Sequence, residues 1–282
     1  MKTGLIMEGG AMRGLFTCGV IDVLMENNIT FDGGAGISAG AVFGCNFKSR
    51  QHGRPLRYNL NYCKDPRYGS FVSVLKTGDL FDADFCYREV PEVLDPFDAK
   101  AFGENPMEFY VGATNIESGI CEYHLCSDGL KEDTLWMRAS ASMPLVSKPV
   151  KINGHYYLDG GVVDSIPYHY MKTLGYDRNL VVLTQPEGFV KKKANVAALI
   201  KVVMRKYPEL GKAMEVRHER YNEQLKEVEE DEKKGFALII RPPESLKIGR
   251  TEKDRRELER VYQIGRKVSE ERLEDIRSFL KG

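Results

Sequence analysis

The sequence has no excess of either charge and no long hydrophobic run. Its 282 residues contain 41 Lys and Arg against 41 Asp and Glu, so the formal net charge is zero. This balance excludes a strong global attraction to nucleic acid or to an anionic membrane, and only local patches can supply one. No apolar run approaches 18 residues, so we expect no transmembrane helix. With 42% hydrophobic residues, the chain can still bury a substantial core.

We also expect no secretory leader, because Met1 to Gly4 run directly into a short apolar segment. We therefore expect a cytoplasmic protein whose six cysteines are free thiols. Cys121, His124 and Cys126 lie close together, but no second ligand pair follows at a spacing typical of zinc. We expect neither a metal nor another cofactor.

One stretch, Gly36-Ile37-Ser38-Ala39-Gly40, has the pattern Gly-x-Ser-x-Gly. A short Gly-rich segment precedes it, and an apolar segment typical of a buried helix follows over 39–47. This order is typical of a nucleophile elbow, a tight strand-to-helix turn that holds a serine in a strained conformation. The alternative is a Gly-Ser turn without chemistry. An acyl hydrolase would also need a base and donors for an oxyanion.

A second Gly-rich loop follows the strand predicted over 3–7. Gly9, Gly10 and Ala11 lie there, before a helix that begins near Met12-Arg13-Gly14. Glycines let backbone N–H groups approach a reacting carbonyl closely, so this loop is the candidate oxyanion hole. The alternative is a phosphate-binding loop. It is disfavoured because the Gly-Lys-Ser/Thr of a P-loop is missing and Ala11 interrupts Gly-x-Gly-x-x-Gly.

Asp159 is the candidate base. It follows a strand and precedes Gly160-Gly161, which leaves its carboxylate little covered, although a simple turn aspartate is the alternative. A Ser-Asp-His order would need His169 or His218. His169 lies on a short helix without a turn to present it, and His218 lies in a charged helix. A dyad of Ser38 and Asp159 is therefore the economical assignment.

Four separated blocks occur together in one order: Glu8–Gly14, Gly36–Gly40, Arg138–Pro144 and Asp159–Gly161. This combination resembles the patatin-like phospholipases, most closely a bacterial subgroup, over roughly residues 1 to 185. The resemblance implies a three-layer α/β/α sandwich that hydrolyses lipid acyl esters with a Ser-Asp dyad and without calcium.

The resemblance also assigns individual residues. Ser38 would be the nucleophile and Asp159 the base, with oxyanion donors and supporting residues as follows: Gly9, Gly10 and Ala11 as donors; Arg13, Gly36, Gly40 and Gly160 in support. Two positions depart from the family pattern: Glu8 stands where many members have Asp, and Ala11 stands where most have Gly. A methyl group at position 11 still permits N–H donation but narrows the allowed dihedrals.

The order of elements, strand–loop–helix–strand–elbow–helix, predicts an α/β fold with a mostly parallel central sheet. Hairpins are predicted around 117–119 and 153–154. We expect a catalytic core over 1–185 and a mainly helical extension over 186–282, packed on the core, that ends in one long helix over 252–280.

Two basic segments leave alternatives open. The segment 48–67 is either a solvated connection or a rim that attracts anionic head groups. Residues 194–207 predict a basic amphipathic helix that either packs on the sheet or lies on a membrane surface. Apolar and basic side chains intermix there: Val196, Leu199, Ile200, Val203, Met204 and Tyr207 among Lys191, Lys192, Lys193, Lys201, Arg205 and Lys206.

The combined hypothesis is a cytoplasmic serine hydrolase of lipid carboxylic esters, of the phospholipase A or lysophospholipase type. Its partner is a lipid or other acyl ester, with peripheral contact at the inner membrane surface and no nucleic acid. The alternatives are a short-chain esterase or an acyltransferase with the same dyad, and a catalytically weak lipid-binding module. The head group, the acyl chain length, the positional preference and the oligomeric state stay open.

Overall fold

The computed structural model describes residues 1–193 and 196–282, and side chains except those at 194–198 and 201. Within this part of the chain, eight strands form one sheet in the order β5-β6-β3-β2-β1-β7-β8, with β4 also paired to β3. The strands are β1 (Lys2–Met7), β2 (Gly33–Ile37), β3 (Glu108–Asn115), β4 (Ile120–Cys126), β5 (Val150–Ile152), β6 (His155–Asp159), β7 (Tyr176–Val182) and β8 (Ala237–Ile240).

The middle of the sheet is parallel. Strands β3, β2, β1, β7 and β8 all run in one direction, while β4 and β6 pair antiparallel with β3, and β5 pairs antiparallel with β6. This confirms the predicted α/β fold with a mostly parallel sheet. The carboxyl ends of the parallel strands meet at one edge, where loops of α/β proteins form their sites.

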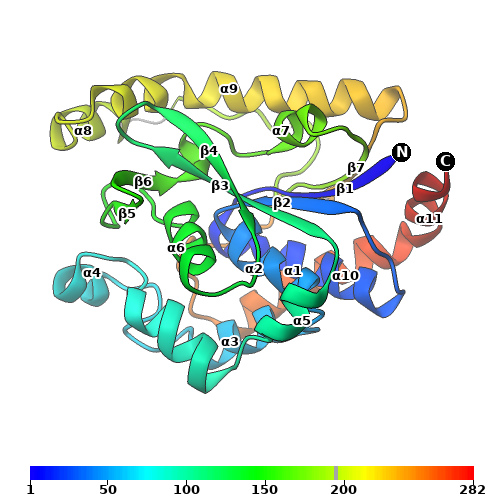
Figure 1. Ribbon diagram of the computed structural model, residues 1–282, viewed down its shortest axis with the longest axis horizontal. Coiled ribbons are helices and arrows are strands. Elements are labelled where there is room, and N and C mark those ends of the chain that lie inside the picture. Colours follow the sequence, from blue (N-terminus) through cyan, green and yellow to red (C-terminus); the bar gives the residue numbers. More distant parts are fainter. Residues whose placement is uncertain (194–195) are drawn as a thin grey trace.

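Helices cover both faces of the sheet, which gives three layers (Figure 1). Helices α1, α2 and α10 lie on one face and α7 and α9 on the other. The helical elements are η1 (Ala11–Arg13), α1 (Gly14–Glu26), α2 (Ala39–Lys48), α3 (Arg54–Tyr62), α4 (Phe71–Thr77), η2 (Phe85–Leu94), α5 (Ala99–Glu104), α6 (Lys131–Ser140), η3 (Gly160–Val162), α7 (Tyr168–Thr173), α8 (Val196–Val203), α9 (Pro208–Lys233), α10 (Arg255–Glu271) and α11 (Leu273–Lys281). No helix among the described residues is both long and apolar enough to cross a membrane.

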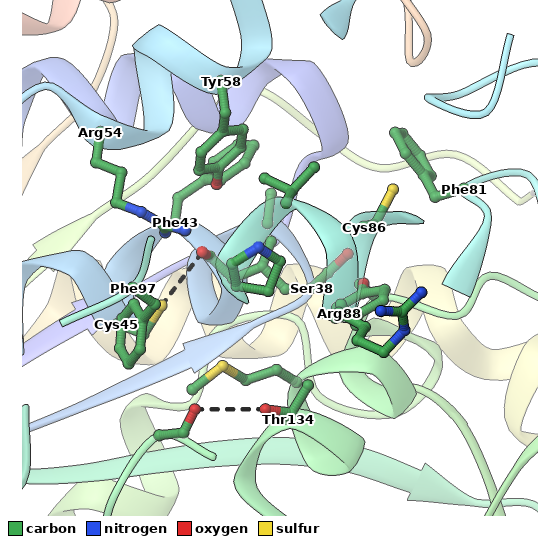
Figure 2. Close-up of a pocket in the computed structure, with 18 of the residues that line it drawn as sticks. Ser38, Phe43, Cys45, Arg54, Tyr58, Phe81, Cys86, Arg88, Phe97 and Thr134 are labelled. Atoms are coloured by element: carbon green, nitrogen blue, oxygen red, sulfur yellow. Dashed lines mark hydrogen bonds between the residues drawn. The ribbon is translucent and has the colours of Figure 1, made fainter. Parts of the chain in front are cut away.

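The segment 48–67 differs from its prediction. It contains α3, and Arg54 at the start of this helix is only 4% exposed. The guanidinium points inward beside Phe97 (Figure 2) and donates to the Asp95 carbonyl oxygen and the Asn46 Oδ1. A buried cation needs such partners, and here they join three segments. The interpretation as a solvated connection is therefore wrong at this position.

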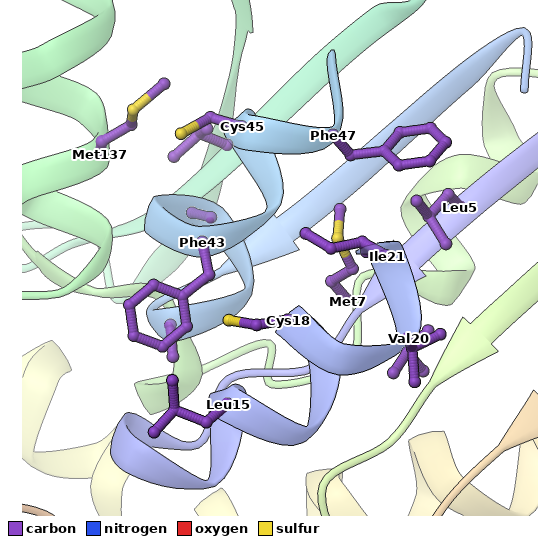
Figure 3. Packing of buried hydrophobic residues seen from close by; sticks show 14 of the residues in the cluster. Leu5, Met7, Leu15, Cys18, Val20, Ile21, Phe43, Cys45, Phe47 and Met137 are labelled. Atoms are coloured by element: carbon purple, nitrogen blue, oxygen red, sulfur yellow. The ribbon is translucent and has the colours of Figure 1, made fainter. Parts of the chain in front are cut away.

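The larger core cluster lies between the sheet and the α1–α2–α10 layer (Figure 3). Leu15, Cys18 and Ile21 of α1 belong to this cluster together with Leu5 and Met7 of β1, and all five are fully buried. The other residues of α1 from Gly14 to Met25 are buried as well, because α10 packs against this helix from outside the sheet.

The C-terminal part contributes to the same sheet and the same layer. Strand β8 pairs in parallel with β7, and α10 packs against α1. Close packing depends on two glycines, because a Cβ at Gly19 would overlap the Tyr262 carbonyl oxygen and one at Gly265 would overlap that of Phe16. The helix expected over 252–280 is interrupted at Arg272, whose ψ of 9° separates α10 from α11.

Candidate active site

The turn between β2 and α2 holds Ser38 at the carboxyl edge of the sheet. Ser38 has φ 54° and ψ −120°, a conformation that a residue with a Cβ rarely adopts. The flanking glycines are needed for steric reasons. A Cβ at Gly36 would overlap the Gly40 carbonyl oxygen, and one at Gly40 would overlap that of Met7. The Gly-x-Ser-x-Gly segment therefore has the geometry of a nucleophile elbow.

The Ser38 hydroxyl donates a hydrogen bond to Asp159 Oδ2 at 2.8 Å. The pairing of β3 explains this contact across 121 residues. Ile37, the last residue of β2, pairs with Gly112 of β3, and Asp159, the last residue of β6, pairs with the adjacent Ala113. Strands β2 and β6 therefore end next to each other along one edge of β3.

Backbone and side-chain contacts hold this pair in place. The Gly161 N–H donates to Asp159 Oδ1 at 2.7 Å, and the Thr114 hydroxyl donates to the Asp159 carbonyl oxygen at 2.9 Å. The Ser38 N–H donates to the Ser140 Oγ at 2.8 Å. Ser140 lies in the block Arg138–Pro144, one of the four blocks of the family resemblance, to which the sequence had assigned no role.

Burial raises the pKa of the Asp159 carboxyl above its ordinary value. The hydrogen bonds from Ser38 and Gly161, and the positive charges of Arg217 and Lys191, act in the opposite direction. The sequence had predicted a carboxylate with little cover, whereas Asp159 is only 8% exposed. The two cations were not expected either, because neither belongs to a motif and both lie beyond residue 185.

The loop after β1 approaches the serine closely, since a Cβ placed on Gly9 would lie 3.1 Å from the Ser38 Cβ. The Gly9 N–H, however, donates to the Ser165 carbonyl oxygen at 3.3 Å. The N–H groups of Gly10 and Ala11 have no acceptor among the described residues. Ala11 has a φ of 49°, which lies in the left-handed region that favours glycine. Glycine is the residue expected at this position from the family pattern.

Glu8 anchors this loop and does not face the serine. It is 1% exposed and accepts hydrogen bonds from the Thr184 N–H and hydroxyl, and from the Tyr221 hydroxyl at 2.8 Å. Arg13 lies nearby, with its Nε 3.4 Å from the Thr184 Oγ1. The Glu8 carboxylate thus joins β1 to the end of β7 and to α9.

A largely apolar cavity of about 560 Å³ opens beside Ser38 (Figure 2). Its wall is formed by α2, α3, η2 and α6 and by the loops around 68 and 81. The apolar and aromatic side chains that line it are Val42, Phe43, Tyr58, Tyr68, Phe81, Val90, Pro91, Phe97, Leu130, Met137 and Met143. The volume lies within the range of about 300–1,000 Å³ that is typical of ligand pockets.

The five histidines contact acidic side chains away from Ser38 and Asp159. His169 Nδ1 lies 3.3 Å from Glu227, and His218 Nε2 lies 3.7 Å from Glu219. The other three, His52, His124 and His155, are paired with Glu26, Asp133 and Glu117. The geometry therefore offers the serine a carboxylate partner.

One group has donor atoms close enough to suggest a metal site. The ligand atoms of His124, Cys126 and Asp133 lie within 4.8 Å of one another. Asp133 already accepts from His124 at 2.6 Å and from the backbone N–H groups of 127–129. These bonds give the carboxylate a structural role, which is to close the loop between β4 and α6.

Comparison with known families agrees with this geometry. The model of the patatin-like phospholipase family matches residues 5–172, more than half of the chain. The chain belongs to the patatin-like phospholipase family. A second model, described as a domain of unknown function (DUF6363), matches residues 207–281.

Similar proteins include the uncharacterized protein YjjU of Escherichia coli, which is 28% identical over 66% of this chain and 52% of its own length. The lysophospholipase nte1 of Emericella nidulans is 32% identical over 62% of this chain and 11% of its own length. Among solved structures, VipD from Legionella pneumophila superimposes with a TM-score of 0.47 at 14% identity, over 97% of this chain and 67% of that one. The chain thus spans about half of YjjU and about a tenth of nte1.

Proposed function

We propose that this protein is a serine hydrolase of lipid carboxylic esters, of the phospholipase A or lysophospholipase type. The observation that carries the proposal is the 2.8 Å hydrogen bond from the strained Ser38 hydroxyl to Asp159. A serine needs a base within hydrogen-bond reach, and a carboxylate whose pKa is raised by burial is a better base than one in water. Family membership agrees with this reaction class.

In the proposed reaction, the Ser38 oxygen attacks the ester carbonyl while its proton passes to Asp159. The N–H groups of Gly10 and Ala11 donate to the resulting oxyanion, because the Gly9 N–H is already engaged. The tetrahedral intermediate expels the alcohol, which takes the proton from Asp159 and leaves an acyl-serine. Water then attacks the acyl-serine while Asp159 takes its proton. The second tetrahedral intermediate releases the fatty acid as the Ser38 oxygen leaves and takes the proton back from Asp159.

The cavity indicates which esters suit the site. Its apolar wall begins at Ser38 and can bury a long acyl chain, and each buried methylene stabilises the complex by about 0.8 kcal/mol. A short-chain esterase would have no use for this space. We therefore favour long-chain esters over the short-chain alternative.

We further propose a peripheral membrane contact through two exposed apolar helices. On α4, Phe71 is 76% and Leu75 88% exposed, and on α8, Leu199 is 53% and Val202 72% exposed. Helix α4 lies between Tyr68 and Phe81, which both line the cavity, and both helices lie on the same side of the molecule (Figure 1). Exposed apolar patches of this kind are typical of interaction surfaces.

Lys191, which was predicted to belong to the same basic surface, instead lies against Tyr221, so charge reversal there would not test membrane contact. The side chains of Val196 and Lys201 lie outside the described residues. A sharper test is sedimentation with anionic and zwitterionic vesicles, comparing Leu75→Asp/Val202→Asp with Phe236→Asp. Phe236 is 52% exposed and precedes β8 at the opposite edge of the sheet. Equal sedimentation of the two variants would contradict the proposal.

The catalytic proposal is tested with a fluorophosphonate probe and a panel of lipid esters. Wild type should be labelled and should hydrolyse long-chain esters. Ser38→Ala should lose labelling, and its turnover should fall by several orders of magnitude. The residual activity would come from the oxyanion donors. Unlabelled wild type that still binds lipid would favour the weak lipid-binding module. Acyl transfer to added alcohol in place of water would favour the acyltransferase.

A further inference from the structure

Three cationic side chains outside the apolar cavity lie near Asp159 and the loop after β1. They are Arg13, Lys191 and Arg217, and none of them lines that cavity. Each keeps part of its surface exposed, and within the described residues none forms an ion pair with a carboxylate. Partly buried cations without paired carboxylates are unusual, since burial penalises the charged form.

Lys191 is held in place by α9. Its Nζ lies 3.7 Å from the centroid of the Tyr221 ring, while its backbone N–H donates to Asn222 Oδ1 at 2.9 Å and its carbonyl accepts from Asn222 Nδ2 at 3.1 Å. Burial lowers the pKa of Lys191 to about 7; the charges of Arg217 and Arg13 add to this effect, while those of Glu8 and Asp159 act against it. The residue is therefore fixed at a position where a positive charge is disfavoured unless an anion approaches.

Arg217 is part of α9 and lies beside the candidate pair of Ser38 and Asp159. Its Nε donates to the Gly161 carbonyl oxygen, and its Nη2 lies 3.7 Å from where a Cβ of Gly161 would be. The Gly161 N–H is the donor to Asp159 Oδ1. Arg217 thus places a guanidinium within two residues of the candidate base.

A chain of contacts joins Arg13 to Lys191 through Thr184, Glu8 and Tyr221. Glu8 is the buried carboxylate within this chain of contacts, but its oxygens accept from neutral donors, the Thr184 and Tyr221 groups. It links Arg13 and Lys191 through these groups without forming an ion pair with either of them. Planar guanidinium groups and a lysine in one locality match the oxygens of a phosphate.

We propose that Arg13, Lys191 and Arg217 form a subsite that binds a phosphate group of the substrate, with the ester at Ser38 and the acyl chain in the apolar cavity. This inference rests on the proposed ester hydrolysis. It selects single-chain esters with a phosphate near the ester over neutral esters of the same chain. Two of the three residues lie outside the segment 5–172, so the family match does not account for them.

A binding experiment tests the subsite without catalysis. Dodecyl phosphate, which has no ester, is titrated calorimetrically into Ser38→Ala protein below its micelle concentration, with inorganic phosphate and dodecanol as parallel ligands. We expect Lys191→Met in this background to weaken dodecyl phosphate binding about tenfold or more, the loss expected for one charge-assisted contact. Lys192→Met, a neighbouring exposed lysine, should have no effect. Equal affinities in both variants would overturn the subsite.

Inorganic phosphate that binds as tightly as dodecyl phosphate, and is equally weakened by Lys191→Met, would assign the cations to free phosphate and overturn the substrate claim. A kinetic arm compares kcat/KM for 1-acylglycerol phosphate and 1-acylglycerol of equal chain length. The ratio should fall about tenfold or more in Lys191→Met and stay constant in Lys192→Met. Failure of the wild type to cleave either ester, with dodecyl phosphate still bound, would contradict the proposed hydrolysis and not the phosphate subsite.

Discussion

Two sides of the site differ in both chemistry and origin: the apolar cavity beside Ser38, and the cations near Asp159. On one side, α2, α3, η2 and α6 form an apolar cavity, and all of these elements lie within the segment 5–172 that matches the family. On the other side, Glu8 and Arg13 come from that segment, while Lys191 and Arg217 come from beyond it. Under the two proposals, the segment that matches the family supplies the acyl cavity and the reacting residues, and the C-terminal part adds selection for charge.

The largest expected effect concerns the base that both sides share. Asp159→Asn should lower kcat about 10²–10⁴-fold, the usual contribution of a general base, since Asn fills the same space but cannot take a proton. His169→Gln and His218→Gln should keep most of the activity. Steady-state kinetics with a check of thermal unfolding would measure this. An active Asp159→Asn together with an inactive histidine variant would contradict the dyad.

The same residue should set the pH profile. In the proposed reaction Asp159 must be ionised, and burial raises the pKa of its carboxyl, so kcat/KM should fall as pH decreases, at a pH above the ordinary carboxyl range. Replacing Arg217 by Met removes a charge that lowers this pKa, so the acidic limb should move to higher pH. An unmoved limb would show that Arg217 does not influence the base.

Gly10→Val tests the loop between the two sides. A Cβ at Gly10 would lie 2.7 Å from the Thr184 Oγ1, so a branched side chain should displace the backbone N–H. Loss of one oxyanion donor costs about 2.7–4 kcal/mol, about 10²–10³ in kcat. Gly249→Val makes the same change where an added Cβ would meet nothing closer than 3.8 Å, and it should keep the wild-type kcat. A folded Gly10→Val enzyme with unchanged kcat would place the donors elsewhere.

Val42→Phe should alter the apolar side alone. Val42 lies one helical turn after Ser38 and lines the cavity, so a ring there would exclude part of a long chain. Each methylene excluded forfeits about 0.8 kcal/mol, so the ratio of kcat/KM for C16 over C8 esters should fall about tenfold. Val93→Phe makes the same change at a 65% exposed position and should keep the wild-type ratio. A constant ratio in Val42→Phe would mean that the chain lies elsewhere.

The smallest effect is expected from Ala11→Gly. The left-handed conformation of Ala11 costs about 1–2 kcal/mol, and the greater freedom of glycine in the unfolded chain offsets about 0.4–1 kcal/mol of the gain. Stability to denaturant should therefore rise by less than about 1.5 kcal/mol. Ala101→Gly within helix α5 should instead lower it by up to about 1 kcal/mol. A loss of stability in Ala11→Gly would show that the methyl group packs favourably.

Local patterns in the sequence predicted the parts of this protein whose geometry is set by neighbours along the chain. The two Gly-rich turns and the hairpin around Asn153-Gly154 depend on residues within a few positions of one another. The elbow at Ser38 belongs to this class, because the small residues that it needs are adjacent in the sequence.

The tertiary structure alone decided what meets Ser38. Asp159 reaches it because β2 and β6 end next to each other on β3. The Gly9 N–H does not face the site as a free donor, because it donates to the Ser165 carbonyl oxygen. The charges of Lys191 and Arg217 come from chain that no local pattern connects to the serine. Pairing between distant strands and packing between distant helices depend on contacts that the residues of one segment do not specify, and these contacts determined the environment of Asp159.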